Sequence, residues 1–275
     1  MKQNELILVI GVVIGAILLI GCVERMYKPS VIFTCTTFFD FKKRDRWMTF
    51  QRAIRELQIH DGSYLPTTFL IINEYSEAPR EDWTKKMAIT FPHMTFIQKT
   101  KEQKGQAASL NIILDRIKPY DYWIQWEDSW FPDRPFLARA YNIMNTTGIS
   151  QLQVTRDNES VSWTNEDSKI SNTTDGTEFI RINPSPQLNK FLGKDAKEYT
   201  HNWIGQGGWP LFSLQPSINR VSDIYTLPYF STDPALWPVK FEWDFARHWI
   251  LNRNTKAVLP DGPVIRKDHV STYAY

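Results

Sequence analysis

Apolar residues recur along the first half of the chain in two alternating patterns. Short runs rich in β-branched and aromatic residues predict buried strands, and apolar residues three and four positions apart predict helices between them. The expected strands are 30–37, 67–72, 94–98 and 120–126, and the expected helices are 45–59, 81–89 and 107–117. Strands that alternate with helices in this way form a mostly parallel sheet with right-handed crossovers. The pattern therefore predicts an α/β fold, a Rossmann-like sheet with helices on both faces.

The second half of the chain is less regular. We expect helices at 134–145 and 242–251, short strands at 151–154 and 178–182, and a turn at 214–220. The polar stretch 157–175 holds few large apolar side chains, which predicts a long surface loop or lid. Three tryptophans in and after a Gly-rich segment, Trp203, Trp209 and Trp243, could either stack on a sugar ring or pack in the core.

An uncharged apolar run at 6–23 precedes the predicted sheet and is just long enough to cross a membrane. A retained signal-anchor helix in a single-pass membrane protein is the first interpretation. A cleaved secretory signal and a bacterial lipoprotein signal ending at Cys22 are the alternatives. Arg25 and Lys28 favour a cytoplasmic domain by the positive-inside rule, but the side of the membrane stays open. The expected organisation is an anchor at 1–29 and one domain at 30–275, with halves 30–145 and 146–275.

Composition narrows the class of protein. The chain has 275 residues and a formal net charge of +2. What remains after the apolar segment suits one large domain or two small ones. A net charge so near zero gives no electrostatic reason to expect a nucleic-acid partner. Its two cysteines, Cys22 and Cys35, provide neither a disulfide framework nor a zinc site.

Two adjacent acids, Glu127 and Asp128, follow the fourth predicted strand directly. Pro132 and Pro135 come next and prevent that strand from resuming as a central strand. In an open α/β sheet, ligands bind beyond the carboxyl ends of the strands, so acids at this position face a crevice. Acids placed there usually hold a cation, a ribose or a proton. The alternative is an acidic turn before a helix that begins near Pro132.

Four short motifs extend this prediction when they are taken in order along the chain. They are residues 34–37 (TCTT) after the first strand, Asn73-Glu74 after the second, Gly105 and Asn111 around a helix start, and Glu127-Asp128-Ser129 followed by Pro132-Asp133. In this order the chain resembles glycosyltransferases of the GT-A fold, in particular family 2 and the N-acetylglucosaminyltransferase I type. The resemblance covers residues 30–145 by motif, and the later half only by the order of its elements.

The resemblance implies a membrane-anchored enzyme that transfers a hexose or N-acetylhexosamine from a nucleotide-diphosphate donor, most often a UDP-sugar, to a glycan, lipid or glycoprotein. Transfer would invert the sugar's configuration. Mn²⁺ or Mg²⁺ would be the cofactor, because a divalent cation stabilises the charge of a diphosphate leaving group. Asp128 and the late His269 are the metal ligands implied, and Lys104 and Arg266 are phosphate partners. The donor-binding residues implied are Thr34, Thr36, Asn73, Glu74, Lys104, Glu127 and Asp128.

The resemblance also places a catalytic base late in the chain, at the start of a helix beside the acceptor. Asp244 is the first candidate and Glu242 the second. In the alternative, both acids only stabilise the N-terminus of that helix. One departure from the family pattern is clear, because Ser129 stands where the family has a metal-binding acid. A neutral hydroxyl is a poorer ligand for Mn²⁺ or Mg²⁺ than a carboxylate. Either Asp128 takes over the metal, which is the favoured interpretation, or metal binding is weak, or the enzyme works without a metal.

Two other functions stay open on the sequence alone. Ser129 favours a catalytically inactive module that binds a nucleotide sugar or a glycan on the same fold. A nucleotidyltransferase also uses carboxylates and a divalent ion on an α/β sheet. Such enzymes usually have a Gly-rich loop after the first strand, and residues 34–40 (TCTTFFD) contain no glycine. The nucleotidyltransferase is therefore the weakest of the three.

Overall fold

The computed structural model describes residues 29–39, 44–76, 83–155, 169–236 and 239–266. Contacts within the chain separate residues 1–30 from residues 31–275, and the helices and strands below belong to the second unit. The described part of the chain contains no helix with the length and apolar character needed to cross a membrane. The apolar run at 6–23 lies outside the described residues.

Eleven strands occur in the described residues. They are β1 (Val31–Thr37), β2 (Thr68–Asn73), β3 (Met94–Gln98), β4 (Tyr122–Glu127), β5 (Trp130–Pro132), β6 (Gln151–Gln153), β7 (Lys169–Asn172), β8 (Glu178–Ile182), β9 (Ser217–Arg220), β10 (Lys256–Val258) and β11 (Val264–Arg266). Nine of these described strands form one sheet in the order β3-β2-β1-β4-β9-β6-β10-β8-β7, and β11 pairs with β5 in a second, small sheet. The strands β3, β2, β1 and β4 run parallel, whereas β9 is antiparallel to both β4 and β6.

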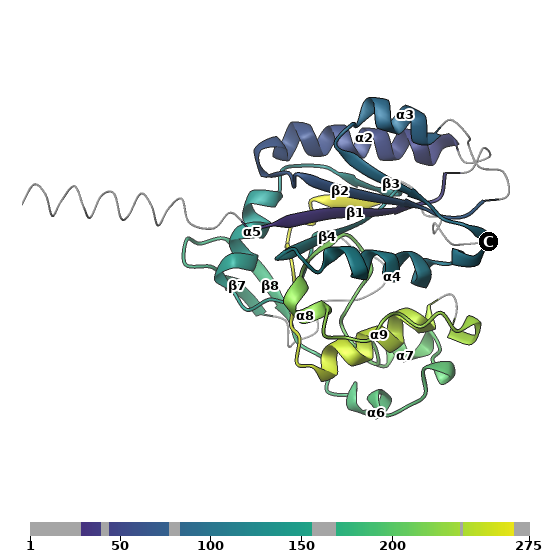
Figure 1. Cartoon of the computed structure of the whole chain (residues 1–275). Coiled ribbons are helices and arrows are strands. Elements are labelled where there is room, and N and C mark those ends of the chain that lie inside the picture. The colour runs from purple at the N-terminus through teal and green to yellow at the C-terminus, as the bar shows by residue number, and fades with distance from the viewer. Residues whose placement is uncertain (1–28, 40–43, 77–82, 156–168, 237–238, 267–275) are drawn as a thin grey trace, which may run out of the picture. The chain divides into compact units, whose positions relative to one another are not determined.

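The α-helices in the described residues are α2 (Arg44–Asp61), α3 (Trp83–Thr90), α4 (Gln106–Ile117), α5 (Leu137–Thr146), α6 (Asn189–Leu192), α7 (Asn202–Gly205), α8 (Val221–Ile224) and α9 (Lys240–Leu251). Short 3₁₀ helices are η1 (Gly62–Tyr64), η2 (Lys101–Gln103), η3 (Ala196–Glu198) and η4 (Pro234–Leu236). Figure 1 shows α2 and α3 over one face of the sheet and α4 over the other. The fold is thus a three-layer α/β arrangement, in which helices cover both faces of the parallel strands β3, β2, β1 and β4.

Each face of the sheet has its own hydrophobic cluster. On β1, Phe33 and Cys35 join the cluster under α2 and α5, whereas Ile32 joins the cluster under α4 and α9. On β4, Trp126 belongs to the first of these clusters and Trp123 to the second. Successive side chains of a strand point to opposite faces, so a strand covered on both sides must be apolar throughout. This is why the runs that predict strands in the first half lack polar alternation.

The pattern of the first half predicted its elements well. All four strands and all three helices are present, with ends shifted by no more than about two residues. The expected helix at 134–145 begins later, at Leu137, after Pro135. The carboxylate of Asp61, at the end of α2, accepts hydrogen bonds from the backbone N–H groups of Phe136 and Leu137, both at 3.0 Å. A side chain distant in sequence therefore satisfies N–H groups that the start of α5 leaves without helical partners.

The second half departs from the expectation in two places. Residues 217–220, part of the expected turn at 214–220, form β9 in the middle of the large sheet. The turn prediction was wrong there, because four residues are too few to show a period and the pairing with β4 and β6 decides their conformation. Strand β7 lies within the expected polar loop 157–175, whose residues 156–168 are outside the described part.

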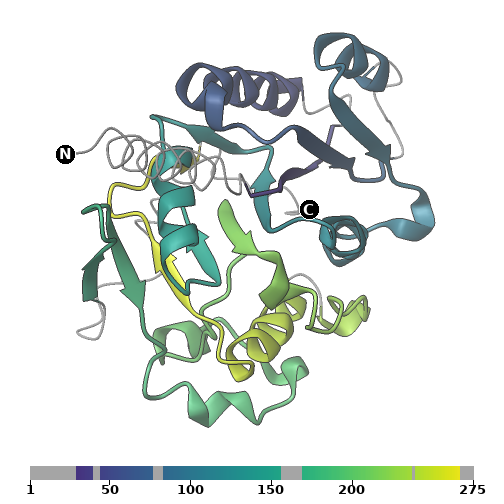
Figure 2. The same ribbon diagram turned by 60° about the vertical axis from the view of Figure 1, so that its left-hand side comes forward.

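The tryptophans of the second half pack against one another. Figures 1 and 2 both show the green α6 and α7 beside the yellow-green α9. The ring centroids of Trp203 and Trp243 are 5.3 Å apart, and the Trp243 indole N–H donates to the Gly208 carbonyl at 2.9 Å. Both tryptophans are buried, and half-buried Trp209 donates to the Phe212 carbonyl. The structure therefore supports the core role rather than sugar stacking for Trp203 and Trp243.

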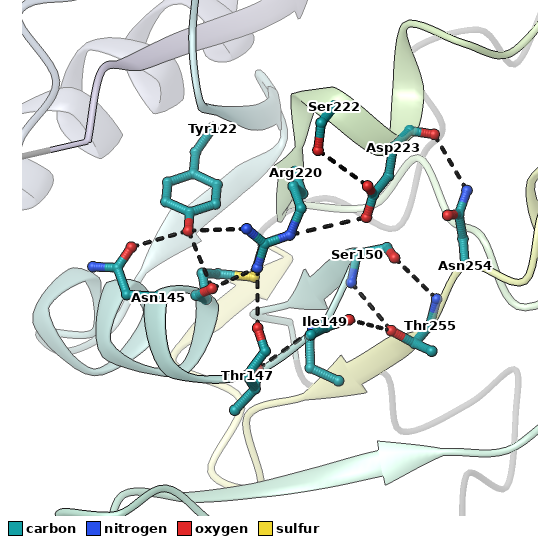
Figure 3. A network of polar contacts seen from close by, with 12 residues as sticks. Tyr122, Asn145, Thr147, Ile149, Ser150, Arg220, Ser222, Asp223, Asn254 and Thr255 are labelled. Carbon is teal, nitrogen blue, oxygen red and sulfur yellow. Dashed lines mark hydrogen bonds and ion pairs between the residues drawn. The ribbon is translucent and has the colours of Figure 1, made fainter.

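A polar network joins three elements at the amino end of β4 (Figure 3). The guanidinium of Arg220, at the end of β9, donates to the Met144 carbonyl at 2.6 Å and to the Thr147 carbonyl at 3.1 Å. It also donates to the Tyr122 hydroxyl at 3.3 Å and lies over that ring. A cation at the C-terminus of α5 satisfies carbonyls that the helix leaves unpaired. The network stabilises the end of the sheet opposite the acids of β4.

Candidate functional site

The strand ends that the motifs follow lie next to one another. In the parallel register, Thr36 of β1 is opposite Ile72 of β2 on one side and opposite Glu127 of β4 on the other. The polar residues after all three strands therefore meet at one edge of the sheet. This is the edge at which open α/β sheets bind ligands.

Glu127 and Asp128 have partners on opposite faces of the sheet, Glu127 in α4 and Asp128 in α2. The Glu127 carboxylate accepts from the Gln106 amide of α4 at 3.1 Å and from the Trp130 indole at 3.3 Å. The fully buried Asp128 carboxylate instead accepts from the backbone N–H of Phe38 at 2.9 Å and lies 3.5 Å from the guanidinium of Arg46, in α2. Asp128 lies in the turn after β4, so the two carboxylates have different partners, while the negative charge of Asp128 still raises the pKa of Glu127.

Glu242, at the start of α9, lies on the same side as Glu127. Its carboxylate accepts a hydrogen bond from the Leu214 N–H at 2.9 Å. Burial raises the pKa of Glu242 to about 7, the negative charge of Glu127 raises it further, and the Leu214 N–H and Lys256 oppose the rise. Burial likewise raises the pKa of Glu127, and Arg266 opposes that rise. A carboxyl whose pKa is near neutrality can both take and release a proton at physiological pH.

Asp244 occupies a different face of the same helix. Two residues along an α-helix correspond to a rotation of about 200°, so Asp244 points away from the side on which Glu242 lies. Its carboxylate pairs with Arg247 at 2.8 Å, and the Arg247 guanidinium lies over Trp243. The geometry therefore favours the second sequence candidate, Glu242, over the first.

Asn73 and Glu74 are buried and have several partners within the chain. The side-chain oxygen of Asn73 accepts from the backbone N–H of Phe39 at 2.7 Å. The Glu74 carboxylate lies 2.9 Å from the Lys99 ammonium and accepts from the Gly105 N–H at 3.2 Å. Lys99 also donates to the Gly105 carbonyl at 2.7 Å. Asn73 thus holds the segment that follows β1, and Glu74 holds the start of α4.

Two of the three threonines of β1, Thr34 and Thr36, lie inside the sheet layers. The Thr34 hydroxyl accepts from the Trp123 indole N–H at 2.7 Å, and Thr34 is fully buried. The carbonyl of Thr36 accepts from the Asp128 N–H at 3.3 Å. Both side chains are buried in the free protein, and their predicted role in donor binding stays a prediction.

A cavity of about 440 Å³ opens between the start of α4 and the segment that leads into α9. Lys104, Ala107, Ser231, Asp233 and Phe241 are among its lining residues. Gly105 precedes the first turn of α4 with a φ of 108°, a conformation that favours glycine. Lys104 therefore lies at a ligand-sized space.

The described residues do not form a ready site for a divalent cation. Among them, no group of three or more His, Cys, Asp or Glu side chains is placed to hold a metal. Both oxygens of Asp128 already have hydrogen-bond donors, and the buried Ser129 hydroxyl has no hydrogen-bond partner. His269 lies outside the described residues. The donor set consists of a neutral hydroxyl and a carboxylate paired with arginine, which is poor chemistry for Mn²⁺ or Mg²⁺.

The sequence matches no protein-family model and no curated protein. Its fold is similar to GalNAc-T7 with UDP, GalNAc and Mn²⁺ (TM-score 0.55, 10% identity, 87% of this chain and 44% of that chain). It is also similar to the mannosyltransferase PcManGT of Pyrobaculum calidifontis with GDP-Man and Mn²⁺ (TM-score 0.51, 12% identity, 91% of this chain and 59% of that chain). A third similar structure is residues 1–349 of S. aureus TarS (TM-score 0.50, 10% identity, 86% of this chain and 60% of that chain).

The chain has a GT-A fold. It spans between 44% and 60% of the length of these three structures. At this identity the similarity concerns the fold, and the chemistry has to be argued from the site. Within this fold, Glu74, Glu127 and Asp128 lie at or just after the carboxyl ends of β2 and β4, and Glu242 lies at the start of α9. Three residues that contact these acids were not predicted from the sequence. They are Arg46, which pairs with Asp128, Lys99, which pairs with Glu74, and Gln106, which donates to Glu127.

Proposed function

We propose that the protein is a glycosyltransferase that takes a sugar from a nucleotide-diphosphate donor and transfers it to a hydroxyl of an acceptor. The observation that carries this proposal is Glu242, an acid with a pKa of about 7 beside Glu127 at the ligand-binding edge of a GT-A sheet. Two structures of similar fold contain UDP with GalNAc, and GDP-Man. They support a nucleotide sugar as the donor class.

Glu242 is the catalytic base of the proposed reaction. Its carboxylate takes the proton of the acceptor hydroxyl while the hydroxyl oxygen forms a bond to the anomeric carbon of the donor sugar. The bond between that carbon and the diphosphate oxygen breaks, and the nucleoside diphosphate leaves with the bonding electrons. Attack from the side opposite the leaving group inverts the configuration. The carboxylate form of Glu242 is required, so activity increases as the pH rises through about 7.

Finer statements rest on the sequence resemblance. We propose a UDP-sugar as the donor, a hexose or N-acetylhexosamine as the transferred group, and a glycan, lipid or glycoprotein as the acceptor. The apolar run at 6–23 would anchor the protein in a membrane as a single-pass helix. The cavity beside α4, with Lys104 among its lining residues, is large enough for one sugar unit.

A panel of donors tests the proposal. Release of nucleoside diphosphate from UDP-GalNAc, UDP-GlcNAc, UDP-glucose and GDP-mannose would be measured with wild type, Glu242→Gln and the control Glu178→Gln. Glu178 is an exposed acid on β8. We expect release from at least one donor, a decrease of about 10²–10⁴-fold in Glu242→Gln, and no decrease in the control. Equal release by wild type and Glu242→Gln would refute the role of Glu242.

A non-catalytic module that binds a nucleotide sugar or a glycan is the second candidate. The neutral, partnerless hydroxyl of Ser129 at the third position of the acidic motif favours it. Such a protein would bind a nucleotide sugar in calorimetry and release no nucleoside diphosphate from any donor. The same panel, run together with binding measurements, separates the two candidates.

A further inference from the structure

We propose that the donor diphosphate binds without a divalent cation and that the guanidinium of Arg266 balances its charge. This inference rests on the proposed function, because it concerns the donor of the proposed reaction. It follows from the mismatch between the acidic motif, which would hold a cation, and the contacts that the motif's residues make.

The first observation is the buried ion pair of Asp128 and Arg46. Both residues are almost completely buried, and their closest side-chain atoms are 3.5 Å apart. The other oxygen of Asp128 accepts from the Phe38 N–H. The ion pair is neutral as a whole, so a cation at Asp128 would have to compete with the guanidinium of Arg46. Separating the pair would leave an uncompensated charge in the interior, which is strongly unfavourable.

The second observation concerns the other two positions of the motif. Ser129 supplies a neutral, buried hydroxyl where a carboxylate would be needed. Glu127 also already accepts from Gln106 and Trp130. A divalent cation is bound most strongly by several ionised oxygen ligands. Of the two carboxylates of the motif, Asp128 is paired with an arginine and Glu127 already accepts from two neutral donors, so neither is an unoccupied ligand.

The third observation is an exposed cation beside Glu127. Arg266 is the last residue of β11, and in the small sheet it lies opposite Trp130 of β5. Its guanidinium lies over the Trp130 ring at 5.5 Å from the centroid, and the indole N–H of the same tryptophan donates to Glu127 at 3.3 Å. No ion pair holds Arg266 within the described part of the chain. A guanidinium fixed on an aromatic face presents parallel N–H groups that match two phosphate oxygens.

Isothermal titration calorimetry of UDP and of GDP tests the inference on the full-length protein. Each nucleotide would be titrated in EDTA and in Mn²⁺, with wild type, Arg266→Ala, Arg266→Lys and the control Arg55→Ala. Arg55 is an exposed arginine of α2, and its loss matches the change of charge. Thermal unfolding of each variant checks that all four proteins are folded.

We expect at least one nucleotide to bind in EDTA with a Kd within about threefold of that in Mn²⁺. Arg266→Ala should weaken this binding by at least about tenfold, Arg266→Lys by less, and Arg55→Ala not at all. Binding that requires Mn²⁺, or binding in EDTA that Arg266→Ala leaves intact, overturns the inference and leaves the proposed function standing. Failure of both nucleotides to bind under either condition overturns the proposed function together with the inference.

Discussion

Replacing Glu242 by glutamine should make the folded protein more stable at alkaline pH while it removes the catalytic base. The pKa of Glu242 rises from 4.5 to about 7 in the folded state, because burial disfavours its charge. Between these two values the folded protein keeps a proton that the unfolded chain has lost. Stability therefore falls as the pH rises through this window, and the loss is complete above about pH 7.

The size of the effect follows from the shift. Raising the pKa of Glu242 from 4.5 to about 7 corresponds to about 3 kcal/mol in the free energy of unfolding, at about 1.36 kcal/mol per pH unit. Solvent screening of this partly exposed side chain reduces that contribution to roughly 1–3 kcal/mol. Glutamine has no charge to bury, and its carbonyl oxygen can still accept from the Leu214 N–H. The variant should therefore gain about 1–3 kcal/mol relative to wild type at pH 8 and nothing at pH 4.5.

Urea unfolding at pH 4.5, 6 and 8 measures this difference, and it needs no substrate. The control is Glu178→Gln, which should change stability equally little at all three values because Glu178 is exposed. Equal stability of wild type and Glu242→Gln at pH 8, or a less stable variant, would refute the raised pKa and with it the reason for choosing Glu242 as the base.

Three substitutions test contacts that support the fold. Arg220→Met removes the donors to the carbonyls at the end of α5 and should cost about 1–3 kcal/mol in the free energy of urea unfolding, with lysine at this position recovering part of it. Lys99→Met leaves the buried Glu74 carboxylate without its cation and should cost about 3–5 kcal/mol, of which the double variant with Glu74→Gln should recover part. Gly207→Ala should lower stability by about 1–3 kcal/mol, because φ is +75° and an added Cβ would lie 2.2 Å from a serine oxygen, whereas Gly193→Ala, with open space around it, should not. An unchanged midpoint in any of the three would contradict the contact concerned.

The sequence predicted the parallel half of the sheet because its strands are buried on both faces. Runs such as residues 68–73 (TFLIIN) carry enough apolar residues to identify a strand without knowledge of its neighbours. Strand β9 could not be found in this way. Its four residues take their conformation from pairing with β4 and β6, which lie far away in the chain. Long-range pairing leaves no local pattern for such a short segment.

The candidate site was predicted in part. Motif order located the strand ends and both acids of α9, but it ranked Asp244 above Glu242. Which of the two acids faces Glu127 depends on the rotation of α9, and the packing of Trp243 and its neighbours sets that rotation. Arg46 also escaped prediction. It lies 82 positions before Asp128, and no spacing rule connects them.

The pH dependence of turnover tests the central claim most directly. Nucleoside diphosphate release from the best donor of the panel would be followed from pH 5 to pH 9 with wild type and Glu242→Gln. For wild type we expect kcat/KM to rise about tenfold per pH unit below about pH 7 and to level off above it, and for the variant we expect a low, flat profile. A wild-type profile that is flat across this range, or a variant that keeps the rise near pH 7, would contradict Glu242 as the base.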